Sequence, residues 1–184
     1  MLRNTENSYG LIARILHWVI AFSIIGLISV GFFMSSMEPS PEKFELYGMH
    51  KAFGVIVLSL VVLRIIWRLS NKVVLPATGL PNIMKLAAKS GHLLLYIFML
   101  IMPISGVMMS RFGAHDIPVF GLFVIPGLEK NEELSTFFHT IHVTAIWGFI
   151  VMILMHIGAA FYHHFIYLKL PLSQHHFSVD TGNI

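Results

Sequence analysis

The sequence predicts an all-α integral membrane protein, a bundle of four spanning helices, from three observations. First, 56% of the 184 residues are hydrophobic and only 11% are charged, whereas charged residues make up about a quarter of an average soluble domain. Second, the apolar residues gather in four runs, each long enough to cross a hydrocarbon core, which takes roughly 20 helical residues. Third, several of the eleven histidines lie near the ends of these runs. Residues 1–184 are predicted to form one membrane domain.

Polar segments that contain proline and glycine separate the four runs. The predicted spans cover approximately residues 11–34, 47–69, 90–112 and 137–164. The first run is about twice as long as the apolar core of a secretory signal and has no clear cleavage site, so we expect it to remain as the first helix. The third run contains Pro103, which is expected to kink the helix or loosen one turn.

The basic residues predict the orientation of the bundle. Four spans place both termini on one side of the membrane. That side carries eight Lys and Arg residues and the other side carries four, while seven of the nine acids lie on the other side. The positive-inside rule therefore predicts that both termini are cytoplasmic. The net charge of +3 is explained by this orientation and not by binding to nucleic acid.

The fourth run places two histidines on one helix face, one near each membrane surface. His142 and His156 are 14 residues apart, which leaves an angle of about −40° after four turns and an axial separation of about 21 Å. His139 is a rival to His142, but it lies about 100° away from the face that carries His156. Helical phase therefore favours His142.

Histidines in two other runs match this pair in depth. His17 in the first run lies at the level of His156, and His50 in the second run lies at the level of His142. Two axial imidazoles suit a low-spin b-type haem that transfers electrons, and a chain with no cysteine cannot hold a c-type haem. Each histidine alone is equally compatible with an interfacial side chain. The matched set predicts two haem b groups, because polar groups inside a membrane are costly and tend to be functional.

Several segments of the chain resemble the bacterial b561-type di-haem cytochromes. They are ILHW at 15–18, GMHK at 48–51, GHLLLYIFMLIMPISG at 91–106, VFGLF at 119–123 and the histidine pattern of the fourth run. The resemblance extends over about residues 10–168.

This resemblance implies a location and an activity. The location is the bacterial inner membrane. The activity is that of a superoxide:ubiquinone oxidoreductase, which passes electrons from periplasmic superoxide to ubiquinone. It also implies that His17 and His156 ligate the haem on the cytoplasmic side, and that His50 and His142 ligate the outer haem. The arrangement is also similar to the cytochrome b subunits of membrane-bound formate dehydrogenase and nickel–iron hydrogenase. The alternative is therefore an electron-transfer subunit for a periplasmic dehydrogenase or hydrogenase.

Charged residues near the histidines are candidates for two roles. The candidates for the first role are Arg14, Arg64 and Arg68. They could pair with haem propionates on the cytoplasmic side. The alternative is that they anchor the helices at the lipid headgroups. The candidates for the second role are Lys51 and Arg111. They could attract superoxide to the outer haem by local electrostatics. The alternative is that they only mark the ends of helices.

Three further histidines are candidates for a quinone site on the cytoplasmic side. Reduction of a quinone takes two electrons and two protons, and a histidine that titrates near neutrality can deliver protons. The candidates for this proton-accepting rim are His92, His163 and His164, which are otherwise ordinary interfacial histidines. A metal or proton transporter is the rival from another class. It is disfavoured because the predicted spans contain no Asp or Glu, and intramembrane carboxylates are common in ion pathways.

Overall fold

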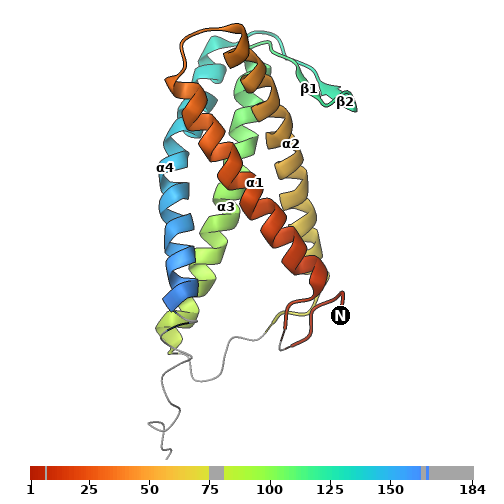
Figure 1. Cartoon of the computed structure of the whole chain (residues 1–184), viewed down its shortest axis with the longest axis vertical. Coiled ribbons are helices and arrows are strands. Elements are labelled where there is room, and N and C mark those ends of the chain that lie inside the picture. The colour runs from red at the N-terminus through yellow and green to blue at the C-terminus, as the bar shows by residue number, and fades with distance from the viewer. Residues whose placement is uncertain (7, 75–80, 163–164, 166–184) are drawn as a thin grey trace, which may run out of the picture.

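The computed structural model describes residues 1–6, 8–74, 81–162 and 165, and it confirms the predicted all-α bundle (Figure 1). Within these residues, four helices are long and apolar enough to cross a membrane. They are α1 (Leu11–Ser36), α2 (Pro41–Leu69), α3 (Asn82–Phe112) and α4 (Glu132–Tyr162), and two short strands, β1 (Ile117–Val119) and β2 (Phe123–Ile125), lie between α3 and α4.

The two ends of the bundle differ. The hairpin end carries the α1–α2 turn, residues 37–40, and the α3–α4 connection, residues 113–131, at the top of Figure 1. The terminal end carries the start of the chain, the end of α2, the start of α3 and the last residues of α4. These two names are used below.

α2 and α4 begin before the predicted spans, and a side chain caps the first turn of each. The Ser40 hydroxyl accepts a hydrogen bond from the Lys43 backbone N–H at 3.3 Å, and Pro41 follows at the first helical position, where its missing N–H costs nothing. The Asn131 side chain accepts from the Leu134 N–H at 3.0 Å in the same way. α2 begins six residues before its predicted span and α4 begins five residues before its own. α3 begins inside the segment between the second and third predicted spans.

The helices pack as a chain of neighbours, with α1 on α2, α2 on α3 and α3 on α4. A buried cluster of Ile20, Val57 and Val61 joins α1 to α2, and apolar side chains of α3 pack against it. α3 and α4 approach so closely that a Cβ on Gly148 would lie 2.8 Å from the Phe98 ring. By contrast, α4 makes almost no close backbone contact with α1 or α2 over the described residues.

A small β-hairpin lies in the segment that the sequence predicted only as a long loop. β1 and β2 are antiparallel, with Val119 opposite Phe123. Three residues, 120–122, connect the strands. Phe120 and Gly121 have φ angles of 47° and 73°, the left-handed pair of a type I′ turn, and the Leu122 N–H closes this turn on the Val119 carbonyl at 2.9 Å. The strained Phe120 packs against Phe53 of α2, with ring centroids 4.9 Å apart. The fully buried Ile117 and Val119 attach the hairpin to the side of α2.

Candidate functional site

At the terminal end, the structure brings His17 of α1 and His156 of α4 together, as the sequence predicts. Their ring centroids are 6.2 Å apart and the rings are nearly perpendicular, at 72°. Both side chains are half-buried. Because the backbones of α1 and α4 hardly approach each other over the described residues, the two imidazoles meet in the space between these helices.

At the hairpin end, His50 of α2 and His142 of α4 form a second pair of the same kind. Their ring centroids are 6.4 Å apart and the interplanar angle is 81°. His139, the rival candidate, is exposed, as the helical phase predicts. α4 thus contributes one histidine to each pair, and α1 and α2 contribute the others.

The separation within each pair fits two axial ligands of one metal. An imidazole nitrogen binds a metal at roughly 2.0 Å, and the ring centre lies roughly 1.1 Å behind that nitrogen, so two opposed rings are about 6 Å apart. The observed 6.2 Å and 6.4 Å match this value. Each pair offers two imidazoles, and no group of three or more His, Asp or Glu among the described residues is arranged to hold a free metal ion. Two ligands suit the iron of a haem, whose other four positions are filled by the porphyrin.

The surroundings of His142 are shaped for an imidazole. Its Nδ1 lies 2.9 Å from the Met102 carbonyl oxygen and 3.2 Å from the Ser105 hydroxyl, both on α3. A Cβ on Gly106 would lie 3.2 Å from Cε1 of His142, so a larger residue at position 106 would crowd the ring. These contacts orient the ring toward His50.

His50 is held differently. A Cβ on Gly31 of α1 would lie 3.6 Å from Cε1 of His50, which is ordinary contact. Its Nδ1 is buried and has no hydrogen-bond partner among the described residues. A buried polar atom without a partner is uncommon, and its presence here means that the His50 ring lacks the support that the His142 ring receives from α3.

A third histidine belongs to the terminal-end cluster. The His92 ring of α3 lies 5.6 Å from the His156 ring, closer than the His17 ring is. The sequence predicted His92 as part of a rim nearer the cytoplasm, and the structure places it directly against the histidine pair. His163 and His164, the other two residues of that predicted rim, lie outside the described residues.

Two arginines of α2 lie near this cluster. The Arg64 Nε donates to the Tyr96 hydroxyl at 3.3 Å and its Nη1 donates to the Ala13 carbonyl at 3.4 Å. Arg68 lies over the Tyr96 ring, 5.5 Å from its centroid. The charge of Arg64 lies within electrostatic range of all three histidines. The ion pairs of the described residues, Lys72 with Glu6 and Lys130 with Glu132, involve neither arginine.

Sequence reasoning missed Tyr96. The signal was its position four residues after His92, which places both on one face of α3. Tyr96 is half-buried and receives both arginines, so it fixes the position of two positive charges beside the histidine pair.

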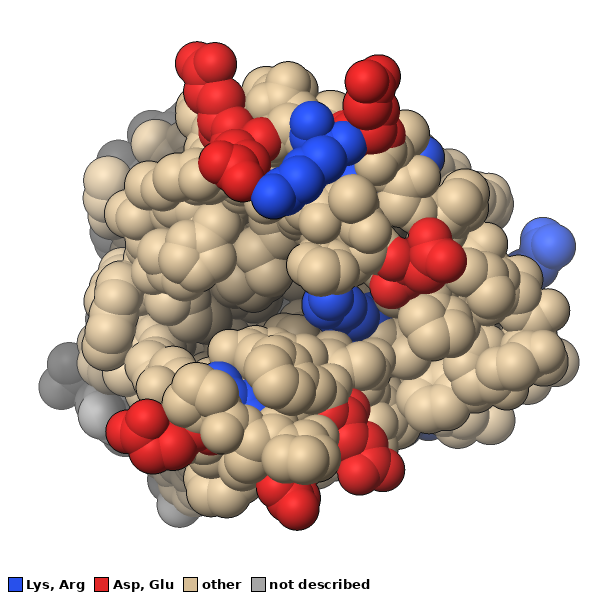
Figure 2. Space-filling view, turned by 90° about the horizontal axis from the view of Figure 1, so that it is seen from above, with Lys and Arg blue, Asp and Glu red and all other residues tan. Residues whose placement is uncertain are grey.

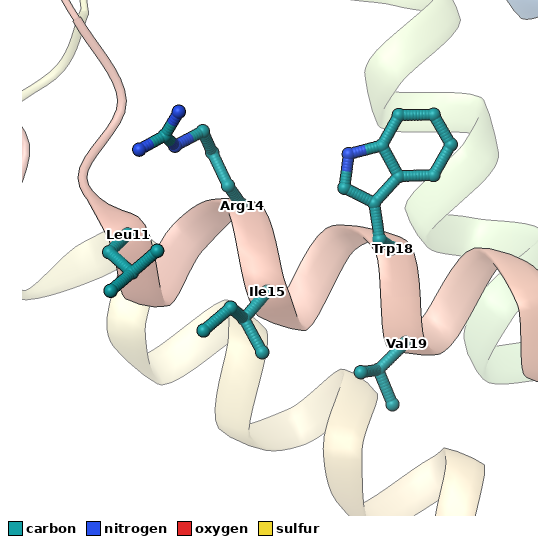
Figure 3. Close-up of a pocket in the computed structure, with 5 residues that line it drawn as sticks. All are labelled: Leu11, Arg14, Ile15, Trp18 and Val19. Atoms are coloured by element: carbon teal, nitrogen blue, oxygen red, sulfur yellow. The ribbon is translucent and has the colours of Figure 1, made fainter.

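Arg14 is exposed and takes part in neither ion pair of the described residues. It lies with Leu11, Ile15, Trp18 and Val19 in a shallow depression of about 400 Å³ on α1. Figure 3 shows the Arg14 and Trp18 side chains on the same side of the helix, away from Ile15 and Val19. A cation beside an aromatic ring near a helix end is typical of an interfacial anchor.

The hairpin end combines an acidic rim with basic groups in its interior. Figure 2 shows acidic side chains spread around this end and a basic side chain in a central hollow. Lys51, the residue after His50, is half-buried. Arg111 donates from Nε to the Pro126 carbonyl at 3.1 Å, so it also holds the connection between α3 and α4 in place.

Comparisons with known proteins agree with this geometry. Residues 8–174 match the family model described as prokaryotic cytochrome b561. The chain is 30% identical over 171 residues to cytochrome b561 homolog 2 of Escherichia coli (strain K12), covering 89% of this chain and 88% of that protein. It is 31% identical over 121 residues to cytochrome b561 homolog 1 of the same organism, covering 64% and 66%.

Four spanning helices with two facing histidine pairs define a membrane cytochrome of the b type. The family match extends over nearly all of the chain, and the chain therefore belongs to the prokaryotic cytochrome b561 family. It is a multi-pass bacterial membrane protein of a family that binds haem b and transfers electrons.

Proposed function

We propose that this cytochrome holds two haem b groups, one at each end of the bundle, and conducts electrons across the inner membrane. The observation that carries the proposal is the presence of two histidine pairs with ring separations of 6.2 Å and 6.4 Å. His17 and His156 are the proposed ligands at the terminal end, and His50 and His142 those at the hairpin end. Bound haem supplies reversible one-electron chemistry.

The protein's own residues orient and tune these sites. Each pair of histidines would hold one haem, and an iron bound by two imidazoles would have no free position for oxygen. Arg64 and Arg68 lie near the terminal-end pair without a carboxylate partner in the described part of the chain, so they are the proposed partners of the propionates there. Arg14 is exposed on α1 beside Trp18, and we assign it to the membrane interface.

The proposed orientation places the terminal end in the cytoplasm and the hairpin end in the periplasm. It rests on the excess of Lys and Arg at the terminal end. Electrons then enter at the hairpin end and leave at the terminal end. The inner membrane is the proposed location because it is where a periplasmic donor and a membrane quinone meet.

The proposed reaction oxidises superoxide and reduces ubiquinone. Two superoxide anions each give up one electron and leave as dioxygen, and one ubiquinone takes the two electrons and two protons to become ubiquinol. Lys51 is the proposed local attractant for superoxide because it is half-buried beside His50. Arg111 plays a smaller part because it already binds the Pro126 carbonyl. His92 is the proposed quinone-binding residue because it contacts His156, and His163 and His164 complete the proposed site.

Purified protein in liposomes that contain ubiquinone tests this reaction. We expect one ubiquinol to form for every two superoxide anions that are generated enzymatically. Superoxide dismutase should abolish the formation of ubiquinol. Heat-denatured protein in the same liposomes is the control for uncatalysed reduction. Protein that contains two haems but forms no ubiquinol above this control would contradict the proposed donor.

A second candidate function is favoured by the acids at the hairpin end. Seven acidic residues, four of them within residues 116–133, lie at the hairpin end of the bundle. Their negative charge opposes the approach of an anion. Such a face suits a donor protein with a basic docking surface. The chain would then be the electron-transfer subunit of a periplasmic dehydrogenase or hydrogenase. Purification of the native complex from the membrane distinguishes the two, because this candidate requires a tightly bound peripheral subunit.

A further inference from the structure

Three groups of α3 lie against the His142 ring. They are the Met102 carbonyl, the Ser105 hydroxyl and the bare Cα of Gly106, and we call them the α3 seat. Ser105 is 2% exposed and donates its hydroxyl hydrogen to the Met102 carbonyl at 2.9 Å. The seat lies next to Pro103, in the middle of a helix that continues without interruption to Phe112.

The seat fixes which nitrogen of His142 carries the proton. A carbonyl oxygen can only accept, so the contact of 2.9 Å between His142 Nδ1 and the Met102 oxygen requires a proton on Nδ1. The Ser105 oxygen, whose own hydrogen points to Met102, accepts a share of the same N–H at 3.2 Å. A neutral imidazole protonated on Nδ1 has a free lone pair on Nε2, and that lone pair is the one available to a metal.

The partner of His142 has no such support. The Nδ1 of His50 is buried without a hydrogen-bond partner among the described residues. A hydrogen bond from the second ring nitrogen to a carbonyl orients a ligating imidazole and raises its basicity. The two histidines of the hairpin-end pair therefore differ in donor strength, although they have the same side chain.

We propose that Ser105 and Gly106 are positioning residues that fix the ring and tautomer of His142 and thereby tune the haem at the hairpin end. The proposal rests on the proposed haem ligation by His50 and His142. A more basic ligand favours ferric iron over ferrous iron and lowers the reduction potential. Loss of the Ser105 hydroxyl removes one of the two acceptors of the Nδ1 hydrogen, so the potential of this haem rises.

Three single variants of the full-length, haem-loaded protein test the proposal. Ser105→Ala removes the hydroxyl, and Gly106→Ala places a methyl group 3.2 Å from Cε1 of His142, close enough to displace the ring. Ser59→Ala is the matched control, because Ser59 of α2 donates to a helix carbonyl at 3.0 Å in the same manner but contacts no histidine. The two haems are followed by redox titration and by the electron paramagnetic resonance of ferric low-spin iron, and His142→Ala identifies the signals of the hairpin-end haem.

The expected outcomes differ between the two haems of one molecule. In Ser105→Ala, the hairpin-end haem shows a raised potential and an altered resonance, while the terminal-end haem is unchanged. In Gly106→Ala, haem content falls from two per chain toward one, with loss of the hairpin-end signals. Ser59→Ala matches the wild type. The inference is overturned if Ser105→Ala matches the wild type in both haems or shifts both equally, even where Gly106→Ala fails to fold. Failure of the proposed ligation looks different, because His142→Ala would then retain both haems.

Discussion

The imidazole of His92 on α3 lies 5.6 Å from the imidazole of His156 on α4, with the rings at 63°. One face of a proposed haem ligand is thus in contact with a residue from the neighbouring helix, at the membrane surface assigned to the quinone. A molecule that hydrogen-bonds to His92 lies one ring away from the terminal-end haem ligand. This contact leads to the first prediction.

His92→Phe should weaken quinone binding while both haems remain. The ring is kept, so the packing against His156 is preserved, but the hydrogen bond to a quinone carbonyl is lost. One hydrogen bond is worth about 1 kcal/mol, so KM for ubiquinone is expected to rise roughly five- to tenfold. Steady-state assays with reduced protein and added quinone measure this. His139→Phe, at an exposed histidine of the hairpin end, is the control and should match the wild type. Unchanged KM in His92→Phe would remove His92 from the quinone site.

Arg64→Gln should lower the reduction potential of the terminal-end haem only. A positive charge beside a haem favours the reduced state, and at an assumed separation of roughly 10 Å with an effective dielectric of about 20 it is worth about 1.7 kcal/mol. That corresponds to roughly 70 mV for a one-electron couple. Redox titration of both haems measures the shift. Arg14→Gln, at the depression on α1, should shift the same haem much less. Equal shifts in the two variants would mean that Arg64 has no special place at this site.

Lys51→Gln should slow the reaction with superoxide. Its side chain is half-buried and follows His50 directly, at an end of the bundle where seven acidic residues outnumber four basic ones. We expect kcat/KM for superoxide to fall roughly two- to fivefold and the remaining rate to depend less on salt. Pulse-generated superoxide with optical detection of haem reduction measures the rate. Lys130→Gln removes the same charge from an exposed lysine that is paired with Glu132 at 2.7 Å. If the two variants behave alike, the effect comes from the net charge of the face and not from Lys51.

The four helices and the pairing of the histidines were predictable from the sequence because a membrane restricts the possible structures. Apolar runs must form helices in lipid, and depth along each helix then sorts the histidines. The angle between His142 and His156 on one helix follows from the helical repeat alone. The structure confirms the bundle and brings together both predicted pairs, and ligation of haem by these pairs stays a prediction.

Other features depend on contacts that a helical repeat does not encode. The β-hairpin has strands of three residues, too short for a pattern to appear, and it is held by the packing of Ile117 and Val119 on α2. The position of His92 against His156 follows from how closely α3 packs along α4. The α3 seat could not be derived either, because it needs the distance between Ser105 and a residue 37 positions away.

The most direct test of the two-haem scheme is the number of haem b groups per polypeptide, measured by the pyridine haemochrome assay on detergent-purified protein. We predict two per chain in the wild type and one per chain in both His142→Ala and His156→Ala, with different spectral components lost in the two variants. One haem or none in the wild type, after expression with adequate haem supply, would contradict the scheme, as would two in either variant.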